Sequence, residues 1–288
     1  MKMYLKYFIC HCSKKISKTE TSLILPYLKA FSVSVDASQN TVSCGGAFCY
    51  NRSMENNIKL SVVIPCFNEE KNIARALRRT DEYLLNKNIS GEIIVVDDGS
   101  DDRTAEAAEA LTPELRHSLR VIGLGGNYGK GAAVRRGVME ASGDYILFTD
   151  ADFSTDISEM DIFLGECERN HDIIIASRSL AGSVLDPPQS FFRRAIGTIC
   201  RNMVSLLAVK GYKDTQCGFK LFRRKAAKEI FSHLKTDGFA FDVEVLVLAG
   251  KLGFSVKELP VRWRNAADSS VKPLKDSFAF FIRLLRGF

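Results

Sequence analysis

The sequence has no long hydrophobic run, no CxxC pair and only a small net charge. None of its 288 residues falls in a run of the roughly 18 uninterrupted apolar residues that a membrane-spanning helix needs, and the most apolar candidate, 195–209, is interrupted by Arg201. We therefore expect no transmembrane helix. The eight cysteines are scattered, which favours reduced thiols over a disulfide framework, and their spacing matches no standard zinc module.

The charge is too small to indicate a nucleic-acid-binding protein, since the formal net charge is +6. It is unevenly placed, however. Residues 193–228 hold ten Lys/Arg and a single acid, Asp214. This excess predicts an anionic partner, either phosphate groups or a membrane surface. The alternative is an ordinary solvated helical face.

The first 57 residues differ from the rest of the chain. They lack a sustained hydrophobic period, and 37–51 is rich in small and polar residues. We expect 1–57 to be a poorly structured extension, and Met54 to be an alternative start of the functional chain. Residues 58–288 are then the main domain.

Regular alternation of short apolar runs and amphipathic segments begins at residue 59. The predicted strands are 60–65, 92–96, 120–124, 145–149 and 173–176, and the predicted helices between them are about 68–86, 103–111 and 131–141. This alternation predicts an α/β fold with a mostly parallel sheet covered by helices on both faces. In such sheets ligands bind beyond the carboxyl ends of the strands.

Two acidic pairs follow predicted strands and therefore fall at that edge. They are Asp97-Asp98 and Asp150-Ala151-Asp152. Carboxylates brought together repel one another, and Mg²⁺ or Mn²⁺ relieves this repulsion while accepting phosphate oxygens as further ligands. A single such pair could equally be a turn or a helix cap, but two pairs on one sheet favour a metal and phosphate site.

A glycine-rich loop, 125–131, precedes one of the predicted helices. It is not a Walker A loop, because Leu124 stands at the position of the first glycine and Gly131 follows the lysine where Ser or Thr is required. Its backbone amides could still approach an anion at the helix N-terminus, with Lys130 adding charge.

Several motifs, in order, resemble those of family 2 glycosyltransferases with the GT-A fold. They are Val63–Glu69, Val96–Ser100, Gly126–Gly131 and Asp150–Asp152. Two later segments, Asp214–Phe222 and Phe239–Glu244, are similar to the dolichyl-phosphate β-glucosyltransferase branch, close to dolichol-phosphate mannosyltransferases. The resemblance covers about 58–288 and implies a GT-A domain with C-terminal amphipathic helices.

The resemblance also implies roles for individual residues. Those expected to bind the nucleotide sugar are Pro65, Asn68, Glu69, Asp97, Asp98, Lys130 and Asp150. Asp150 and Asp152 would hold Mg²⁺ or Mn²⁺, although Ser154 stands where mannosyltransferase relatives have a metal-binding Gln. Those expected at the acceptor phosphate are Arg178, Gln216 and Lys220. The catalytic group would comprise Asp152, Arg178, Asp242 and Glu244, the last two orienting sugar hydroxyls or arginines.

The expected activity is inverting transfer of a hexose, from UDP-glucose, to dolichyl or polyprenyl phosphate. A phosphate acceptor is already anionic near neutral pH and needs positioning more than a base. The alternatives are a GDP-mannose donor, a hydroxyl acceptor that requires a base, a nucleotidyltransferase, and a catalytically dead nucleotide-sugar-binding protein.

Two amphipathic segments could place the chain on a membrane surface. Apolar stripes flanked by basic residues occur near 189–209 and at 275–288, which fits helices lying in an anionic interface. Packing into the protein core is the alternative. We expect peripheral attachment to the cytosolic face of a membrane, where nucleotide sugars are available: the endoplasmic reticulum in a eukaryote, the plasma membrane in a prokaryote.

Overall fold

The computed structural model describes residues 33–36, 41–44, 47–49, 59–186 and 211–264, the first three ranges by their backbone alone. The chain divides into two compact units, Met1–Asn56 and Asn57–Phe288. In the first unit, β1 (Val33–Asp36), β2 (Thr41–Cys44) and β3 (Ala47–Cys49) form a small antiparallel sheet. The expectation that 1–57 is a poorly structured extension stays a prediction.

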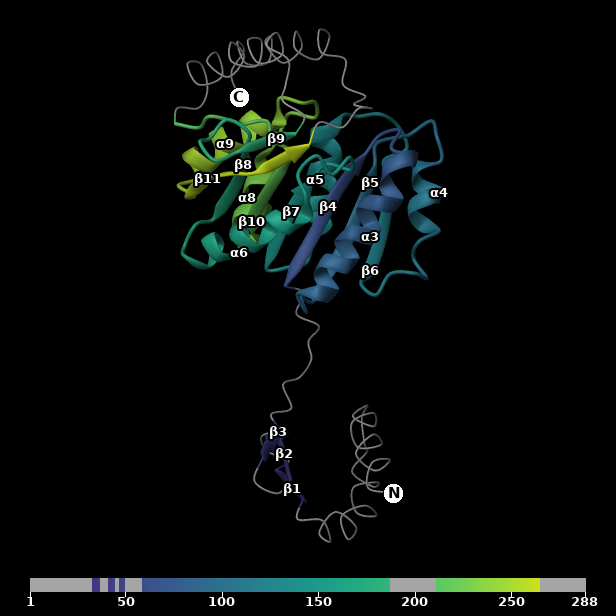
Figure 1. Ribbon diagram of the computed structural model, residues 1–288, viewed down its shortest axis with the longest axis vertical. Coiled ribbons are helices and arrows are strands. Elements are labelled where there is room, and N and C mark those ends of the chain that lie inside the picture. The colour runs from purple at the N-terminus through teal and green to yellow at the C-terminus, as the bar shows by residue number, and fades with distance from the viewer. Residues whose placement is uncertain (1–32, 37–40, 45–46, 50–58, 187–210, 265–288) are drawn as a thin grey trace. The chain divides into compact units, whose positions relative to one another are not determined.

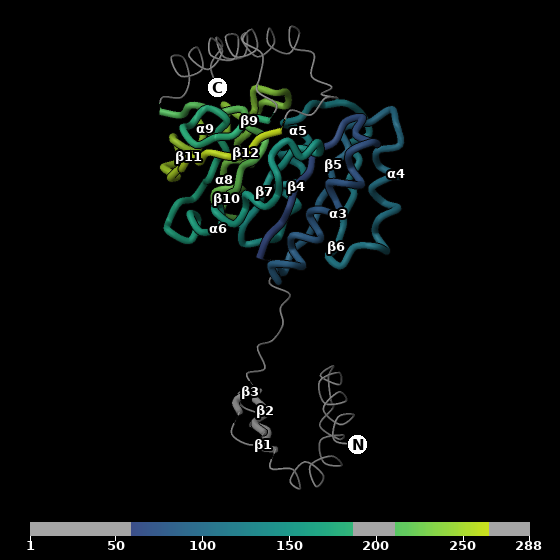
Figure 2. The backbone as a smooth tube through the Cα atoms, viewed as in Figure 1, coloured from purple at the N-terminus to yellow at the C-terminus, as the bar shows by residue number. Residues whose placement is uncertain are grey.

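The second unit is built on a seven-stranded sheet (Figure 1). Its strands are β4 (Leu60–Cys66), β5 (Gly91–Asp97), β6 (Ser118–Gly123), β7 (Tyr145–Thr149), β8 (Ile173–Ser177), β10 (Phe219–Arg223) and β11 (Val256–Pro260). Their order across the sheet is β11-β8-β10-β7-β4-β5-β6, and all seven strands are labelled in Figure 1. The tube in Figure 2 shows β7 and β4 side by side in the middle of this order. Only β10 runs against its two neighbours within this sheet. The predicted mostly parallel sheet is confirmed.

Helices cover both faces of this sheet, as predicted. Helices α3 (Glu70–Asn86), α4 (Thr104–Glu109) and α6 (Met160–Glu168) pack on one face, and α5 (Lys130–Glu140), α8 (Arg224–His233) and α9 (Phe241–Lys251) on the other. Alternation along β4 explains the two layers, because Val62 joins the first core and Val63 the second. Both side chains are completely buried.

Three shorter elements complete the described part of this unit. They are a 3₁₀ turn, η1 (Ile157–Glu159), and the parallel pair β9 (Val184–Asp186) and β12 (Arg262–Arg264). Among the described residues, no helix combines the length and the hydropathy needed to cross a bilayer. The amphipathic helices expected near 189–209 and at 275–288 lie outside the described residues.

The topology brings distant segments to one edge of the sheet. The chain continues from β4 to β5 and β6 on one side and then returns to β7 on the other, so a switch point lies between β4 and β7. Because β10 is antiparallel, its first residue, Phe219, pairs with the last residue of β7, Thr149. The segment 214–218 is therefore delivered to the same edge as 150–152.

Pro65 lies in the part of β4 that extends beyond its pairing with β7, close to this edge of the sheet. A proline has no backbone N–H to give to a sheet. Pairing between β4 and β7 ends at Val63, whereas pairing with β5 continues through Pro65 and Cys66. The end of β4 is thus open on its β7 side, next to the switch point.

Candidate functional site

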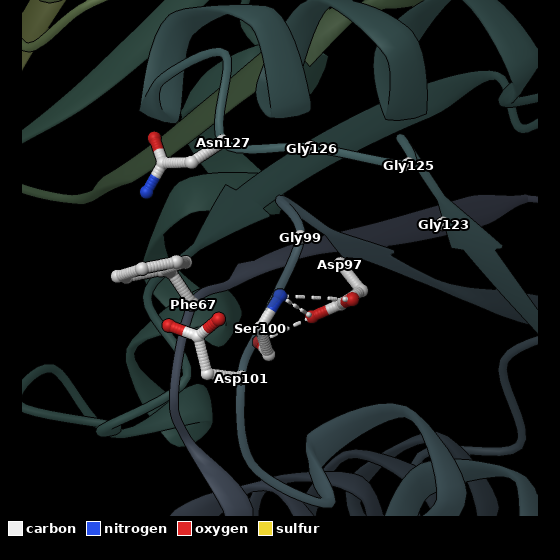
Figure 3. Close-up of a pocket in the computed structure, with 9 residues that line it drawn as sticks. All are labelled: Phe67, Asp97, Gly99, Ser100, Asp101, Gly123, Gly125, Gly126 and Asn127. Atoms are coloured by element: carbon white, nitrogen blue, oxygen red, sulfur yellow. Dashed lines mark hydrogen bonds between the residues drawn. The ribbon is translucent and has the colours of Figure 1, made fainter.

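An open pocket of about 590 Å³ lies at the carboxyl ends of β4, β5 and β6. Its lining residues are Phe67, Asp97, Gly99, Ser100, Asp101, Gly123, Gly125, Gly126 and Asn127. Figure 3 shows Gly123, Gly125 and Gly126 along one side, where the lining is backbone without side chains of its own. The pocket can therefore accept a flat or branched ligand directly against the backbone.

Asp97 is held at the pocket wall by the turn that follows β5. Ser100 donates its backbone N–H to the Asp97 carboxylate at 3.3 and 3.4 Å and also donates its hydroxyl to the same group (Figure 3). Asn68, which has a positive φ of 57°, fixes this turn from the neighbouring loop by accepting from the Asp101 N–H at 2.8 Å. The carboxylate of Asp97 is thereby presented as a hydrogen-bond acceptor for a ligand.

Glu69 connects the same two loops through its backbone. Its N–H donates to the Thr104 hydroxyl at 2.8 Å, and its carboxylate accepts from the Asn72 amide at 2.8 Å. Burial raises the pKa of Glu69 above its usual value, with the nearby aspartates adding to the effect and the Asn72 bond opposing it. Asn68 and Glu69 thus act on the pocket by fixing the loop that carries Asp97.

Asp98 is turned away from the ligand space and binds the glycine loop. Its two oxygens accept from the N–H groups of Tyr128 and Gly129, each at 2.8 Å. Burial raises the pKa of Asp98, and the two amide bonds oppose that shift. Asp98 is therefore an anchor that positions the loop in front of α5, and Asp97 is the partner left to face the pocket.

Gly129 is required where the loop enters α5. Its φ is +107°, and a Cβ there would lie 2.6 Å from the carbonyl oxygen of Asp237. Gly131 is equally tight, since a Cβ at that position would lie only 2.4 Å from the Thr236 carbonyl oxygen. These contacts fix the glycine loop and the 236–238 loop against each other at the sheet edge.

Asp150 and Asp152 follow β7 beside the switch point. Gly218 packs directly on Asp150: a Cβ at this position would lie 1.9 Å from Asp150 Oδ2. Ser154 donates its N–H to Asp152 Oδ1 at 2.8 Å and its hydroxyl to Oδ2 at 2.9 Å. Burial, then the charge of Asp150, raises the pKa of Asp152. Ser154 therefore orients Asp152.

The carboxylates of Asp150 and Asp152 fit a divalent cation that is shared with a phosphate ligand. Among residues 59–186 and 211–264, no group of three His, Cys, Asp or Glu side chains forms a complete metal cage. Mg²⁺ commonly binds through one or two carboxylates, with substrate phosphates and water supplying the other ligands. Burial first and the charge of Asp150 second disfavour the ionised form of Asp152, and a cation would relieve both effects.

Lys130, the first residue of α5, forms an ion pair with Asp150, with Nζ 2.7 Å from Oδ1. Behind them Lys220 and Asp242 form a second pair, whose side chains are only 1% and 4% exposed. Lys220 Nζ also donates to the Cys217 carbonyl at 2.7 Å. Lys220 is thus engaged inside the protein, on Asp242, and does not present its charge to the surface.

Arg178 and Asp214 form a bidentate pair just past the end of β8. Arg178 Nε lies 2.7 Å from Asp214 Oδ2 and Nη2 lies 2.9 Å from Oδ1. Burial alone would raise the pKa of Asp214, but the Arg178 charge outweighs it and holds this pKa below its usual value. The guanidinium also lies 5.7 Å from the ring centre of Trp263 and keeps 28% of its side chain exposed.

Gln216 and Glu244 are the last two of the site residues predicted from the sequence. Gln216 is exposed, and its N–H donates to Asp214 Oδ1 at 3.3 Å, so its side chain extends from the loop that holds Arg178. Glu244 is buried and accepts from the N–H groups of Lys235 and Thr236 at 3.1 and 2.8 Å. Glu244 therefore fixes the loop that packs on the glycine loop.

The sequence motifs located this edge, but they missed several side chains that line its pocket. Phe67, Ser100, Asp101 and Asn127 belong to the motif segments or follow them directly, yet nothing in their residue type distinguished them from loop-forming neighbours. The clue available was position, since each lies close to a strand end or a glycine. The partnership of Asp214 with Arg178 had no local signal, because 36 residues separate the two.

Comparison with known proteins gives a consistent result. A family model described as glycosyl transferase family 2 matches residues 61–231. A dolichyl-phosphate β-glucosyltransferase from Dictyostelium discoideum is 35% identical over 262 residues, which cover 87% of this chain and 80% of that protein. A protein of the same name from Homo sapiens is 34% identical over 248 residues, which cover 80% of this chain and 76% of that protein.

Solved structures show the same fold. Glucosyl-3-phosphoglycerate synthase from Mycobacterium tuberculosis, in complex with Mn²⁺, UDP and phosphoglyceric acid, matches with a TM-score of 0.58 and 19% identity. The match covers 79% of this chain and 76% of that one. At this identity the likeness supports a shared architecture, with the ligands belonging to the other protein.

Proposed function

Since this chain belongs to glycosyl transferase family 2 and is a glycosyltransferase of the GT-A fold, as its motifs predicted, we propose that it transfers glucose from UDP-glucose to dolichyl phosphate with inversion. The observation that carries the proposal is the alignment of an open pocket at Asp97 with the Asp150–Asp152 pair along one sheet edge. The relatives named dolichyl-phosphate β-glucosyltransferase support the sugar and the acceptor.

The nucleoside would occupy the pocket at the ends of β4, β5 and β6. Asp97 would accept a hydrogen bond from the base, while the glycines let the ribose and the diphosphate approach the backbone. Asn68 and Glu69 would support the wall of this pocket through their hydrogen bonds to the loop after β5, and Pro65 would do so as part of the end of β4. Asp98 supports the opposite wall.

Asp150 and Asp152 would hold Mg²⁺ or Mn²⁺ together with the donor diphosphate, and the ion would neutralise the leaving group. Ser154 keeps both oxygens of Asp152 oriented without itself being charged. Lys130 is paired with Asp150, and the charge of Asp150 also acts on Asp242, so both residues are placed to balance the charge that changes when the donor binds. Preset charges of this kind require little reorganisation during the reaction.

The acceptor phosphate would bind at Arg178 with help from Gln216. The Arg178 side chain is 28% exposed and its guanidinium is held by Asp214 in a bidentate pair, so it can meet an anion without first becoming ordered. Lys220 is assigned a supporting role, as the counter-ion of buried Asp242. No general base is needed, because the phosphate oxygen is already anionic, and Glu244 is committed to its loop.

A lipid acceptor requires contact with a membrane. We propose peripheral attachment through the segments near 189–209 and at 275–288, on the cytosolic face where sugar nucleotides are found. The basic excess of residues 193–228 supports an anionic surface as the partner.

The test is a donor screen with the full chain. Purified protein, Mn²⁺ or Mg²⁺ and dolichyl phosphate receive labelled UDP-glucose or GDP-mannose, and the organic phase is counted. We expect label from UDP-glucose alone, reduced about 100-fold in Asp152→Asn. Asp144→Asn is the matched control, because Asp144 is a partly exposed aspartate just before β7, at the opposite edge.

Other outcomes are decisive as well. Label from GDP-mannose alone would contradict the proposed donor and keep the acceptor. Nucleotide-sugar binding without lipid-soluble label from either donor would contradict the lipid acceptor. Release of pyrophosphate in place of UDP would contradict sugar transfer altogether.

A further inference from the structure

Lys130 lies at the place where a cation on Asp150 is expected. Its Nζ is 2.7 Å from Asp150 Oδ1, and the two side chains are 21% and 34% exposed. The backbone on either side is fixed, because Gly129 and Gly131 are each in contact with the carbonyl groups of the 236–237 segment. Lys130 is thus aimed at Asp150 by the fold of its loop and is more than a mobile surface lysine.

The surroundings of Lys130 favour a cation at this point. Its Nζ lies 5.4 Å from the ring centre of Phe148 and 5.9 Å from that of Phe239. The negative faces of aromatic rings attract an ammonium group. The ammonium group of Lys130 thus has a carboxylate in direct contact and two aromatic rings nearby.

Two ion pairs and Asp152 form a group of five charges at Asp150. We define the Asp150 cluster as Lys130, Asp150, Asp152, Lys220 and Asp242. Three carboxylates and two ammonium groups leave one formal negative charge. Without Lys130 the cluster would have two formal negative charges. A divalent cation without a bound nucleotide would then be attracted to it more strongly.

A bound donor changes this balance. The diphosphate of a sugar nucleotide is anionic, and a divalent cation that enters with it adds little net charge to the cluster. A divalent cation that enters alone must instead approach the ammonium group on Asp150 Oδ1. Two positive charges that share one carboxylate repel each other strongly in a partly buried site.

We infer that Lys130 is an internal counter-ion that occupies Asp150 until the donor arrives, so that the divalent cation binds together with the nucleotide diphosphate and not before it. The inference rests on the proposed function, because it takes a sugar nucleotide as the ligand. It assigns Lys130 a role in the order of binding. Once displaced from Asp150, the ammonium is available to an anionic oxygen of the donor.

The test measures Mn²⁺ binding directly and needs no catalytic turnover. The free Mn²⁺ signal in electron paramagnetic resonance is titrated with the full-length protein, with and without UDP. The variants are Lys130→Met, which removes the charge, and Lys130→Arg, which keeps it. Lys225→Met is the matched control, because Lys225 is exposed on α8 and lies near the opposite edge of the sheet.

We expect the wild-type protein to bind Mn²⁺ weakly alone and at least tenfold more tightly with UDP, a change of about 1.4 kcal/mol. Lys130→Met is expected to bind Mn²⁺ alone about tenfold more tightly than the wild type, so that UDP adds less. Lys130→Arg and Lys225→Met are expected to behave as the wild type.

Three results would overturn the inference. One is equal Mn²⁺ affinity in the wild type with and without UDP. Another is unchanged Mn²⁺ affinity in Lys130→Met although the wild type responds to UDP, which leaves the proposed function intact. The third, a wild-type protein that binds neither Mn²⁺ nor UDP, would remove the proposed function itself.

Discussion

Gly218 fixes the position of the Asp150 carboxylate, and no other residue fits there. A methyl group would lie 1.9 Å from Asp150 Oδ2, far inside van der Waals contact. We predict that Gly218→Ala displaces Asp150 and lowers transfer activity about 100-fold. We expect only a small decrease in the free energy of unfolding, because the partly exposed Asp150 carboxylate can move towards solvent. Activity assays combined with thermal unfolding check this.

Gly165 in α6 provides the control for that substitution. Nothing lies within 4 Å of a Cβ added there, so Gly165→Ala should keep full activity and stabilise the helix by about 0.5–1 kcal/mol. Equal activity in the Gly218→Ala and Gly165→Ala variants would contradict the role given to Asp150.

Asp81 makes stability depend on pH. It accepts from the N–H groups of Arg116 and His117 and from His117 Nδ1 at 2.8 Å. Burial alone would raise the pKa of Asp81, but these hydrogen bonds outweigh it and lower the pKa. A depressed pKa stabilises the folded state above the unfolded value, about 3.9, and this contribution is lost as pH falls through the folded value.

We therefore predict that Asp81→Asn lowers the free energy of unfolding by about 2 kcal/mol at pH 7, because the backbone amides lose an ionised acceptor. The difference from the wild type should shrink as the pH falls below about 4. Urea unfolding at pH 7 and at about pH 3.5 measures both. If the variant and the wild type differ in free energy of unfolding by the same amount at both pH values, Asp81 does not stabilise the fold as an ionised group.

At the level of elements, Asp98 joins the end of β5 to the loop before α5. Both of its oxygens accept backbone N–H bonds, so an amide in its place can satisfy only one and turns a donor towards the other. We predict that Asp98→Asn speeds hydrogen exchange at the Tyr128 and Gly129 amides at least tenfold. It should also raise the KM for the donor several-fold.

Asp144→Asn serves as the control for that measurement, since Asp144 pairs with Arg224 at the other edge of the sheet. The Asp144→Asn variant should have the same hydrogen-exchange rates at the Tyr128 and Gly129 amides as the wild type. Unaltered exchange at Tyr128 in Asp98→Asn would show that the loop is held by other contacts.

The elements show what local pattern can predict and where it fails. The strands around Val63, Ile94 and Leu147 were located from apolar runs, because a strand buried on both faces has few polar residues. Neither β10 nor β11 was among the predicted strands, so the antiparallel direction of β10 was missed as well. Lys220 and Arg223 interrupt the apolar residues of β10, and its direction is set by pairing with β7, about 70 residues earlier in the chain.

Lys220 shows the same limit within the candidate site. The family resemblance implies that Lys220 binds the acceptor phosphate, and a lysine is seldom fully buried unless its charge is paired. The structure buries it against Asp242, a residue 22 positions away, on an element that packs over β10. Motifs predict a site at the edge where the structure has the pocket, but only tertiary contacts show that Lys220 is paired with Asp242.

At the scale of the whole molecule, the acceptor requires that the chain reach a membrane. We predict that the full chain floats with vesicles containing anionic lipid at low salt and is released by about 0.5 M NaCl. Reversal of two charges, Arg193→Glu and Arg194→Glu, should weaken binding about tenfold or more. Vesicles of phosphatidylcholine alone are the control. Failure to float with anionic vesicles at low salt would contradict peripheral attachment.

The structure of the product tests the central claim most directly. The claim is that a phosphate oxygen of the acceptor attacks the anomeric carbon of UDP-glucose from the face opposite the leaving diphosphate, without a general base. Nuclear magnetic resonance of the purified product is predicted to show glucose joined through its anomeric carbon to the lipid phosphate in the β configuration. An α linkage, or glucose attached to a hydroxyl group, would contradict the account.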